Sequence, residues 1–144
     1  MIDDEAVRSI VDQTRGYPYF LQEWGAQAWN LASGPCISAA DAVAAADAAL
    51  AGLDASFFRV RFDRLTPKEK AYVRAMAELG PGPHRSGDIA AKHGKPVENC
   101  APLRTGIIKK GMIYSPQHGD TAFTVPMFDA FMRRTMPDWS ASKT

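Results

Sequence analysis

Residues 103–115, LRTGIIKKGMIYS, constrain the fold of this chain more than any other stretch. A segment of helical character ends there at Lys109, Lys110 and Gly111, and a β-prone run follows with no linker between them. A glycine directly after a helix favours the left-handed conformation that ends it. The stretch therefore predicts a helix that is joined directly to a strand.

The residues before this stretch predict two further helices. Thr66, Pro67 and Glu69 form a capping box with proline in the first turn, which predicts the start of a helix at 67. Residues 80–83, GPGP, predict a rigid turn, and Ser86 and Gly94 are expected to cap and close a short helix.

The helix that ends at Lys110 is expected to begin with Asn99 as its N-cap, because proline at 102 is tolerated only in a first turn. After it, the turn residues QHGD (117–120) separate two β-prone runs and predict a hairpin, with Ile113, Phe123 and Val125 facing inward. Pro126 is expected to open a last helix. The order helix, short helix, helix, hairpin, helix is that of a winged helix-turn-helix.

The first half of the chain predicts helices over about 3–13, 18–31 and 38–50, with a further helical stretch near 54–65. Val7, Ile10 and Val11 are expected to form the apolar face of the first helix. Phe20, Leu21, Trp24, Ala28 and Leu31 have helical spacing in the second. We therefore expect a mainly α chain with a small β-hairpin: a helical segment over 1–56, a winged helix-turn-helix over 57–136 and a flexible tail over 137–144.

Charge divides the chain in the same place. Residues 1–56 have two basic and eight acidic side chains, a net charge of −6, whereas residues 57–136 have fourteen basic and seven acidic ones, a net charge of +7. Such a division indicates two segments with different neighbours, of which the basic one suits an anionic polymer. Cys36 and Cys100 stand far apart, which favours two reduced thiols and a cytoplasmic location. No apolar run is long enough to span a bilayer, so no membrane partner is expected.

Three segments together resemble the C-terminal part of AAA+/STAND-type P-loop ATPases: residues 14–22, TRGYPYFLQ; residues 62–90, FDRLTPKEKAYVRAMAELGPGPHRSGDIA; and the stretch from GIIKKGMIYSP to AFTVPMFDAFMRR. In that family a helical lid and a winged helix follow the ATPase core. The resemblance implies that Gly16, Tyr17 and Pro18 match the Gly-x-Pro step at which the lid meets the nucleotide. The residues alone also allow a plain helix–helix turn there, with its aromatic side chains in the core.

The chain has no GxxxxGK[ST] motif, and its nearest string, Gly94-Lys95-Pro96, lacks both the glycine spacing and the hydroxyl. We therefore expect a non-catalytic C-terminal fragment of such an ATPase, with ATP or ADP bound only when the ATPase core is present. The expected partners are DNA, the missing core and, through the C-terminal helix, a second copy in a homodimer. A dimer would also suit a stand-alone transcriptional regulator. No catalytic residues are assigned, and the three histidines lack the spacing of a metal site.

The expected DNA contacts come from the presumed recognition helix and its neighbours. On a helical wheel Cys100, Ala101, Leu103, Ile107 and Ile108 share an apolar arc that also contains Arg104, which is expected to extend past it or to pair with a carboxylate. The assigned contacts are Arg85, Lys95, Asn99, Thr105, Lys109, Lys110 and His118. Glu98, Pro102, Gly106 and a wing without Arg or Lys favour the alternative, a regulatory module that docks onto the ATPase core or another protein.

Overall fold

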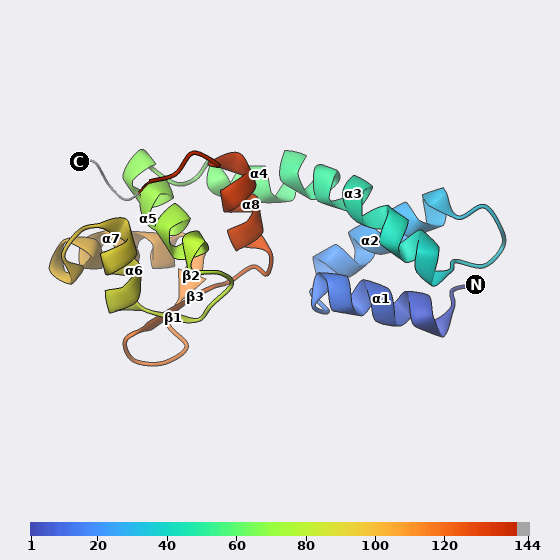
Figure 1. Cartoon of the computed structure of the whole chain (residues 1–144), viewed down its shortest axis with the longest axis horizontal. Helices are drawn as coiled ribbons and strands as arrows, with labels where there is room; N and C mark the ends of the chain where they lie inside the picture. The colour runs from blue at the N-terminus through green and yellow to red at the C-terminus, as the bar shows by residue number, and fades with distance from the viewer. Residues whose placement is uncertain (141–144) are drawn as a thin grey trace. The chain divides into compact units, whose positions relative to one another are not determined.

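The computed structural model describes residues 1–140 as a mainly helical chain with a small three-stranded antiparallel sheet. The chain forms two compact units that divide between Arg59 and Val60 (Figure 1). This division lies inside a short helix, α4 (Phe57–Phe62), slightly beyond the boundary expected between 56 and 57. The two units are described separately below.

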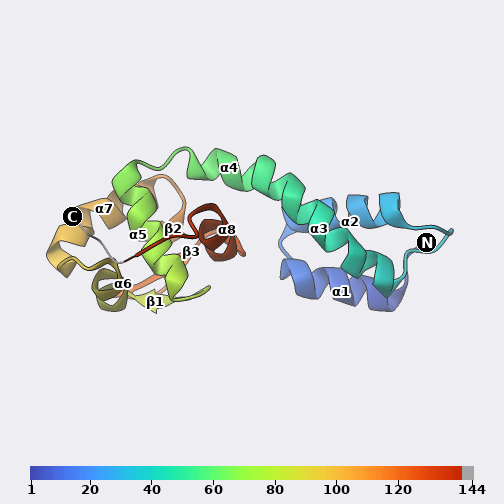
Figure 2. The same cartoon turned by 45° about the horizontal axis from the view of Figure 1, so that its top comes forward.

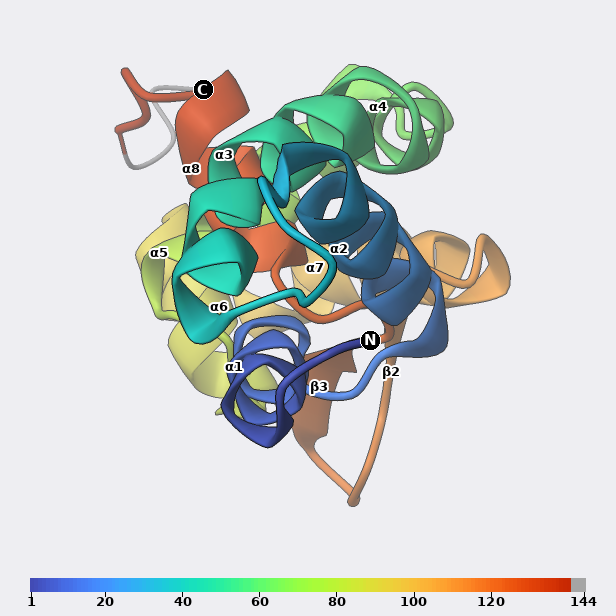
Figure 3. The same cartoon turned by 90° about the vertical axis from the view of Figure 1, so that its right-hand side faces the viewer.

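The first unit consists of α1 (Asp4–Thr14), α2 (Pro18–Leu31) and α3 (Ala39–Ala55), seen end-on in Figure 3. Pro18 opens α2 as predicted, at a position where its missing N–H costs nothing. Ser38 caps α3 in a reciprocal capping box with Asp41. The helix α3 continues to Ala55, beyond its expected end near 50.

The core of this unit lies between α3 and the other two helices. Trp24 is 1% exposed, and its indole N–H donates to Gln13 at 3.0 Å. Small side chains on α3 let the helices approach closely, and its buried residues are Ala42, Ala45, Ala49 and Leu53.

The predicted apolar face of α1 was wrong. Ala6, Ile10 and Thr14 are buried, whereas Val7 and Val11 are each 42% exposed. Ile10 of the predicted face is therefore buried, and the buried stripe continues through Ala6 and Thr14 at four-residue spacing instead of through the two valines. Leu31, expected on the apolar side of α2, is also exposed.

The second unit places α5 (Pro67–Glu78) in contact with α6 (Ser86–His93), α7 (Val97–Lys109) and α8 (Phe128–Thr135) (Figure 2). The capping box of Thr66 and Glu69 begins α5 as predicted. Tyr72, Val73 and Met76 turn inward and are fully buried.

The sheet contains β1 (His84–Arg85), β2 (Ile113–Tyr114) and β3 (Asp120–Phe123), in the order β1-β3-β2. The predicted hairpin is present, with Ile113 opposite Phe123, and its loop 115–119 projects beyond the strands (Figure 1). Ile113 and Val125 are buried as predicted, but Phe123 is only half-buried. The strand β1 was not predicted, because two residues between GPGP and a helix show no periodicity.

Three predicted helix starts were wrong. The N-cap of α6 is Arg85 instead of Ser86, and α8 follows a left-handed Met127 instead of opening at Pro126. The helix α7 begins at Val97 after Pro96, so Asn99 lies inside its first turn and Pro102 lies inside the helix. Pro96 is the N-cap of α7, three residues before the predicted cap at Asn99.

The predicted tail begins at 137. Its described part, residues 137–140, includes Trp139, whose ring faces the Arg74 guanidinium at 5.3 Å. Residues 141–144 lie outside the described part.

Candidate nucleic-acid interface

The predicted DNA contacts lie around α6 and α7. The helix α6 ends at Gly94, whose φ of 82° gives the left-handed conformation predicted for it. Lys95 and Pro96 then lead directly into α7. This short connection fixes α7 beside the C-terminal end of α6.

One buried hydroxyl group connects these helices to the sheet. Thr121 of β3 is fully buried, and its Oγ1 accepts a hydrogen bond from Arg104 Nε at 2.7 Å. The same oxygen lies 3.3 Å from Ser86 Oγ, at the start of α6. Arg104 Nη2 also donates to the Asp120 carbonyl at 3.1 Å. Arg104 therefore binds a hydroxyl and a carbonyl rather than the carboxylate that the sequence led us to expect.

The predicted contact residues are spread over three places. Arg85 is exposed opposite Asp120 in the sheet, close to the loop that carries the exposed His118. Thr105 and Lys109 are exposed on α7, and the Thr105 hydroxyl donates back to the Ala101 carbonyl at 3.0 Å.

The structure removes Lys110 from this surface. Its ammonium group lies 2.5 Å from Glu69 Oε1 and also donates to the Arg64 carbonyl at 2.8 Å. Two residues of the predicted apolar arc also differ from the prediction: Ala101 is exposed, and Ile108 is only half-buried. Cys100 and Ile107 are the buried residues of α7, and at its end Lys110 turns towards α5 whereas Lys109 stays exposed.

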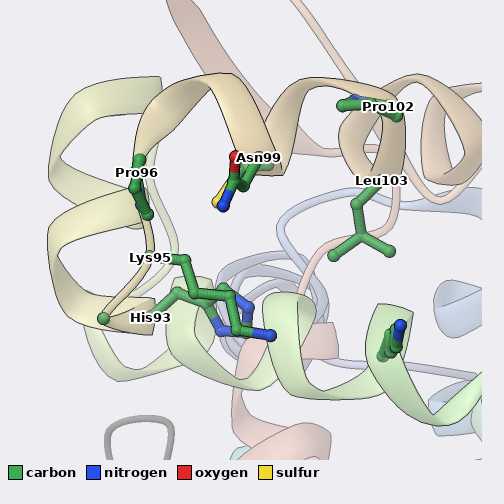
Figure 4. A pocket seen from close by; sticks show the side chains of 9 residues that line it. His93, Lys95, Pro96, Asn99, Pro102 and Leu103 are labelled. Carbon is green, nitrogen blue, oxygen red and sulfur yellow. The ribbon is translucent and has the colours of Figure 1, made fainter. Parts of the chain in front are cut away.

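Lys95 and Asn99 lie together in a cleft of about 540 Å³ between the start of α5, the α6–α7 connection and α7. We call it the lysine cleft; Figure 4 shows Lys95 next to His93, with Asn99 and Leu103 extending from α7. Its lining residues are Lys68, His93, Gly94, Lys95, Pro96, Asn99, Cys100, Pro102 and Leu103. No carboxylate is among them.

The electrostatics of the lysine cleft favour an anion. Burial lowers the pKa of His93, and the nearby Lys95 charge lowers it further, so the imidazole is neutral at pH 7. The Cys100 thiol remains protonated because burial raises its pKa. The two ammonium groups of Lys68 and Lys95 are therefore the charges of this cleft.

Sequence reasoning missed Lys68. Its place in the Thr-Pro-Lys-Glu run predicts only an exposed position in the first turn of a helix. Its approach to Lys95 depends on how α5 packs against the α6–α7 connection, which sequence periodicity does not reveal.

The residues implied by the ATPase resemblance lie in the first unit. Gly16 has a φ of 72°, Tyr17 is the N-cap of α2, and Pro18 is its first residue. The Tyr17 ring packs 4.7 Å from Phe20 and edge-on to Phe57. Phe57 and Phe58 are buried in this aromatic cluster.

Other kinds of site find little support among residues 1–140. No group of three His, Cys, Asp or Glu side chains in this part is arranged to hold a metal ion. None of its helices combines the length and apolar character needed to cross a bilayer. Cys36 and Cys100 are both free thiols; Cys100 is buried and Cys36 is half-buried.

A family model described as "Domain of unknown function (DUF8462)" matches residues 55–132, which is more than half of the chain. No curated protein and no solved structure matches this chain.

Proposed function

The chain belongs to the DUF8462 family, and we propose that its second unit is a winged helix that binds duplex DNA. The order of its elements and the β1-β3-β2 sheet support this proposal, since a winged helix places three helices and a hairpin in this sequence. In this arrangement α7 is the recognition helix and loop 115–119 is the wing.

The lysine cleft carries the proposal. Two ammonium groups without a carboxylate, beside the exposed face of α7, suit the phosphates of a nucleic-acid backbone. Residues 60–140 have thirteen basic and eight acidic side chains, so the whole unit is positive. Few side chains can contact base edges: the exposed polar residues of α7 are Glu98, Asn99, Thr105 and Lys109. We therefore propose binding that depends mainly on phosphate contacts from Lys68, Lys95 and Lys109, with Arg85 beside the wing.

Fluorescence anisotropy with a random-sequence duplex tests this at about 50 and 200 mM salt. Each phosphate contact contributes about −0.9 to the slope of log K against log salt. The double variant Lys68→Ala/Lys95→Ala should therefore have a slope that is smaller in magnitude by roughly 2. Arg8→Ala, an exposed substitution on α1, removes a positive charge from the first unit and serves as the control. Binding that ignores both salt and the two lysine substitutions contradicts the proposal.

The resemblance to ATPase C-terminal regions extends the proposal to a lid. In a full-length ATPase of that kind, the first unit would be the lid that follows the ATPase core, with Gly16, Tyr17 and Pro18 near the nucleotide. The second unit would be the DNA-binding part. Co-purification of this chain with a separately expressed core tests the lid role independently of the DNA titration. Docking without DNA affinity would instead favour the protein-interaction module.

A further inference from the structure

The Tyr72 hydroxyl is a buried polar group without a partner. Tyr72 is fully buried at the centre of α5, and no hydrogen-bond partner for its hydroxyl lies within the described residues. The Thr121 hydroxyl is near enough to influence the Tyr72 pKa, but no hydrogen-bond geometry is met, and that oxygen already accepts from Arg104. Leaving a buried hydroxyl unpaired costs about 1–3 kcal/mol, so native proteins rarely do so without a reason.

This tyrosine lines a pocket of about 200 Å³ between α5, the start of α6 and α7. Its lining residues are Tyr72, Ser86, Val97, Cys100, Ala101, Arg104 and Thr105, and we call it the Tyr72 pocket. The hydroxyl end of Tyr72 is close enough to Arg104 and Cys100 for both to affect its pKa. Tyr72 is therefore part of the pocket wall, and its buried hydroxyl lies in the part of the wall near Arg104 and Cys100.

The pocket has one polar and one apolar side. Arg104 supplies a half-buried guanidinium that has no carboxylate partner among residues 1–140. A partly buried charge without a counter-charge is unfavourable, so this side of the pocket favours an anion. Ser86 and Thr105 add hydroxyl groups, whereas Val97, Cys100 and Ala101 form an apolar wall. Burial raises the pKa of Tyr72 to about 12, which keeps its hydroxyl protonated as a donor at neutral pH.

We propose that the Tyr72 pocket binds a small organic carboxylic acid, with the carboxylate between Arg104 and the Tyr72 hydroxyl and an apolar body against Val97 and Ala101. An apolar cavity of about 150 Å³ accommodates benzene, so the volume of this pocket suits a body of about that size. The proposal does not depend on DNA binding, and a failed DNA titration leaves it unchanged.

Isothermal titration calorimetry of the full chain tests this with sodium benzoate as the probe, at constant ionic strength. Benzamide has the same shape without the charge, and inorganic phosphate has charge without the apolar body. Benzoate is expected to bind saturably and at least about tenfold more tightly than either of them, the size of effect that charged hydrogen bonds give.

Two tyrosine substitutions locate the binding. Tyr72→Phe removes only the unpaired hydroxyl, so the protein should melt at or above the wild-type temperature while benzoate affinity falls about tenfold. Tyr114→Phe, on the exposed strand residue of β2, is the matched control and should leave the affinity within twofold. Equal binding of benzamide or phosphate, unchanged affinity in Tyr72→Phe, or no saturable binding would each overturn the proposal.

Discussion

Glu69 joins the start of α5 to the end of α7. Its side chain, 7% exposed, accepts a hydrogen bond from the Thr66 backbone N–H at 2.8 Å and pairs with Lys110. Gly106 lies one helical turn before Lys110, and a Cβ there would come within 3.1 Å of Glu69 Oε2. The glycine that counted against α7 as a recognition helix in sequence thus leaves room for the Glu69 side chain between α5 and α7.

Replacing Lys110 with alanine should lower the free energy of unfolding by about 1–2 kcal/mol, because it leaves a buried carboxylate without its cation. The pair is partly solvent-screened on the lysine side, which keeps the loss below that of a fully buried pair. Urea denaturation measures it. Lys109→Ala, at the adjacent exposed position, should stay within about 0.5 kcal/mol. Equal effects of the two substitutions would contradict this role of Lys110.

The buried His93 predicts acid sensitivity. Burial, and then the Lys95 charge, lower its folded-state pKa below the usual 6.5, so between these two pKa values the unfolded chain binds more protons. Stability should therefore fall as the pH drops below about 6.5, by at most about 1.4 kcal/mol per pH unit from this group.

His93→Gln should flatten this part of the profile when unfolding is followed by urea titration from pH 7 to 5. His118→Gln, in the exposed loop, is the control and should keep the wild-type slope. Glu69 acts in a separate window: burial opposes its ionisation, but hydrogen bonds from Lys110 and Thr66 lower its pKa below 4.5, so its contribution is lost only as the pH falls below that value. An unchanged slope in His93→Gln would show that other groups cause the loss.

At the scale of elements, α7 contains a proline that weakens the helix. Pro102 lies inside the helix, and because proline has no backbone N–H it cannot donate to the Glu98 carbonyl. Its ring is exposed, so burial of apolar surface does not offset this loss.

Pro102→Ala should therefore stabilise the protein by about 1–2 kcal/mol, the helix-propensity gain less the entropy that proline removes from the unfolded chain. Thermal and urea unfolding measure the change. Pro116→Ala, in the exposed loop 115–119, should bring no gain. A loss of stability in Pro102→Ala would contradict the helix start at Val97.

Local chemistry predicted most of the elements. Proline at 67, the capping box of Thr66 and the glycine at 94 determine helix ends because each acts within a few residues. Long-range packing decided the rest: the two-residue β1 exists only because β3 pairs with it, and Lys110 turns away from solvent only because Glu69 lies opposite. For the same reason Lys95 and Asn99 could be proposed from sequence, whereas Lys68 and the unpaired Tyr72 hydroxyl could not.

At the scale of the whole molecule, charge follows the two units. Residues 1–59 have three basic and eight acidic side chains, and residues 60–140 have thirteen basic and eight acidic ones. An anionic duplex is therefore attracted to the second unit and repelled by the first.

Hydrogen–deuterium exchange with and without random duplex DNA should show this division. Peptides from residues 60–140 should exchange more slowly with DNA, above all those that contain Lys68 and Lys95, because bound ligand stabilises the state it binds. Peptides from residues 1–59 should not change. The same experiment at about 200 mM salt is the control, since screening should remove most of the protection. Protection confined to residues 1–59 would contradict the assignment.

The direct passage from β1 into α6 has a mechanical consequence. The Ser86 backbone N–H donates to the Gly119 carbonyl at 2.8 Å, and Arg85 pairs with Asp120, so the end of loop 115–119 is bound to the first residue of α6. Thr121 and Arg104 extend that fastening to α7. The buried Thr121 hydroxyl therefore lies where β3, α6 and α7 meet, so a change in the position of β3 would act on both helices together.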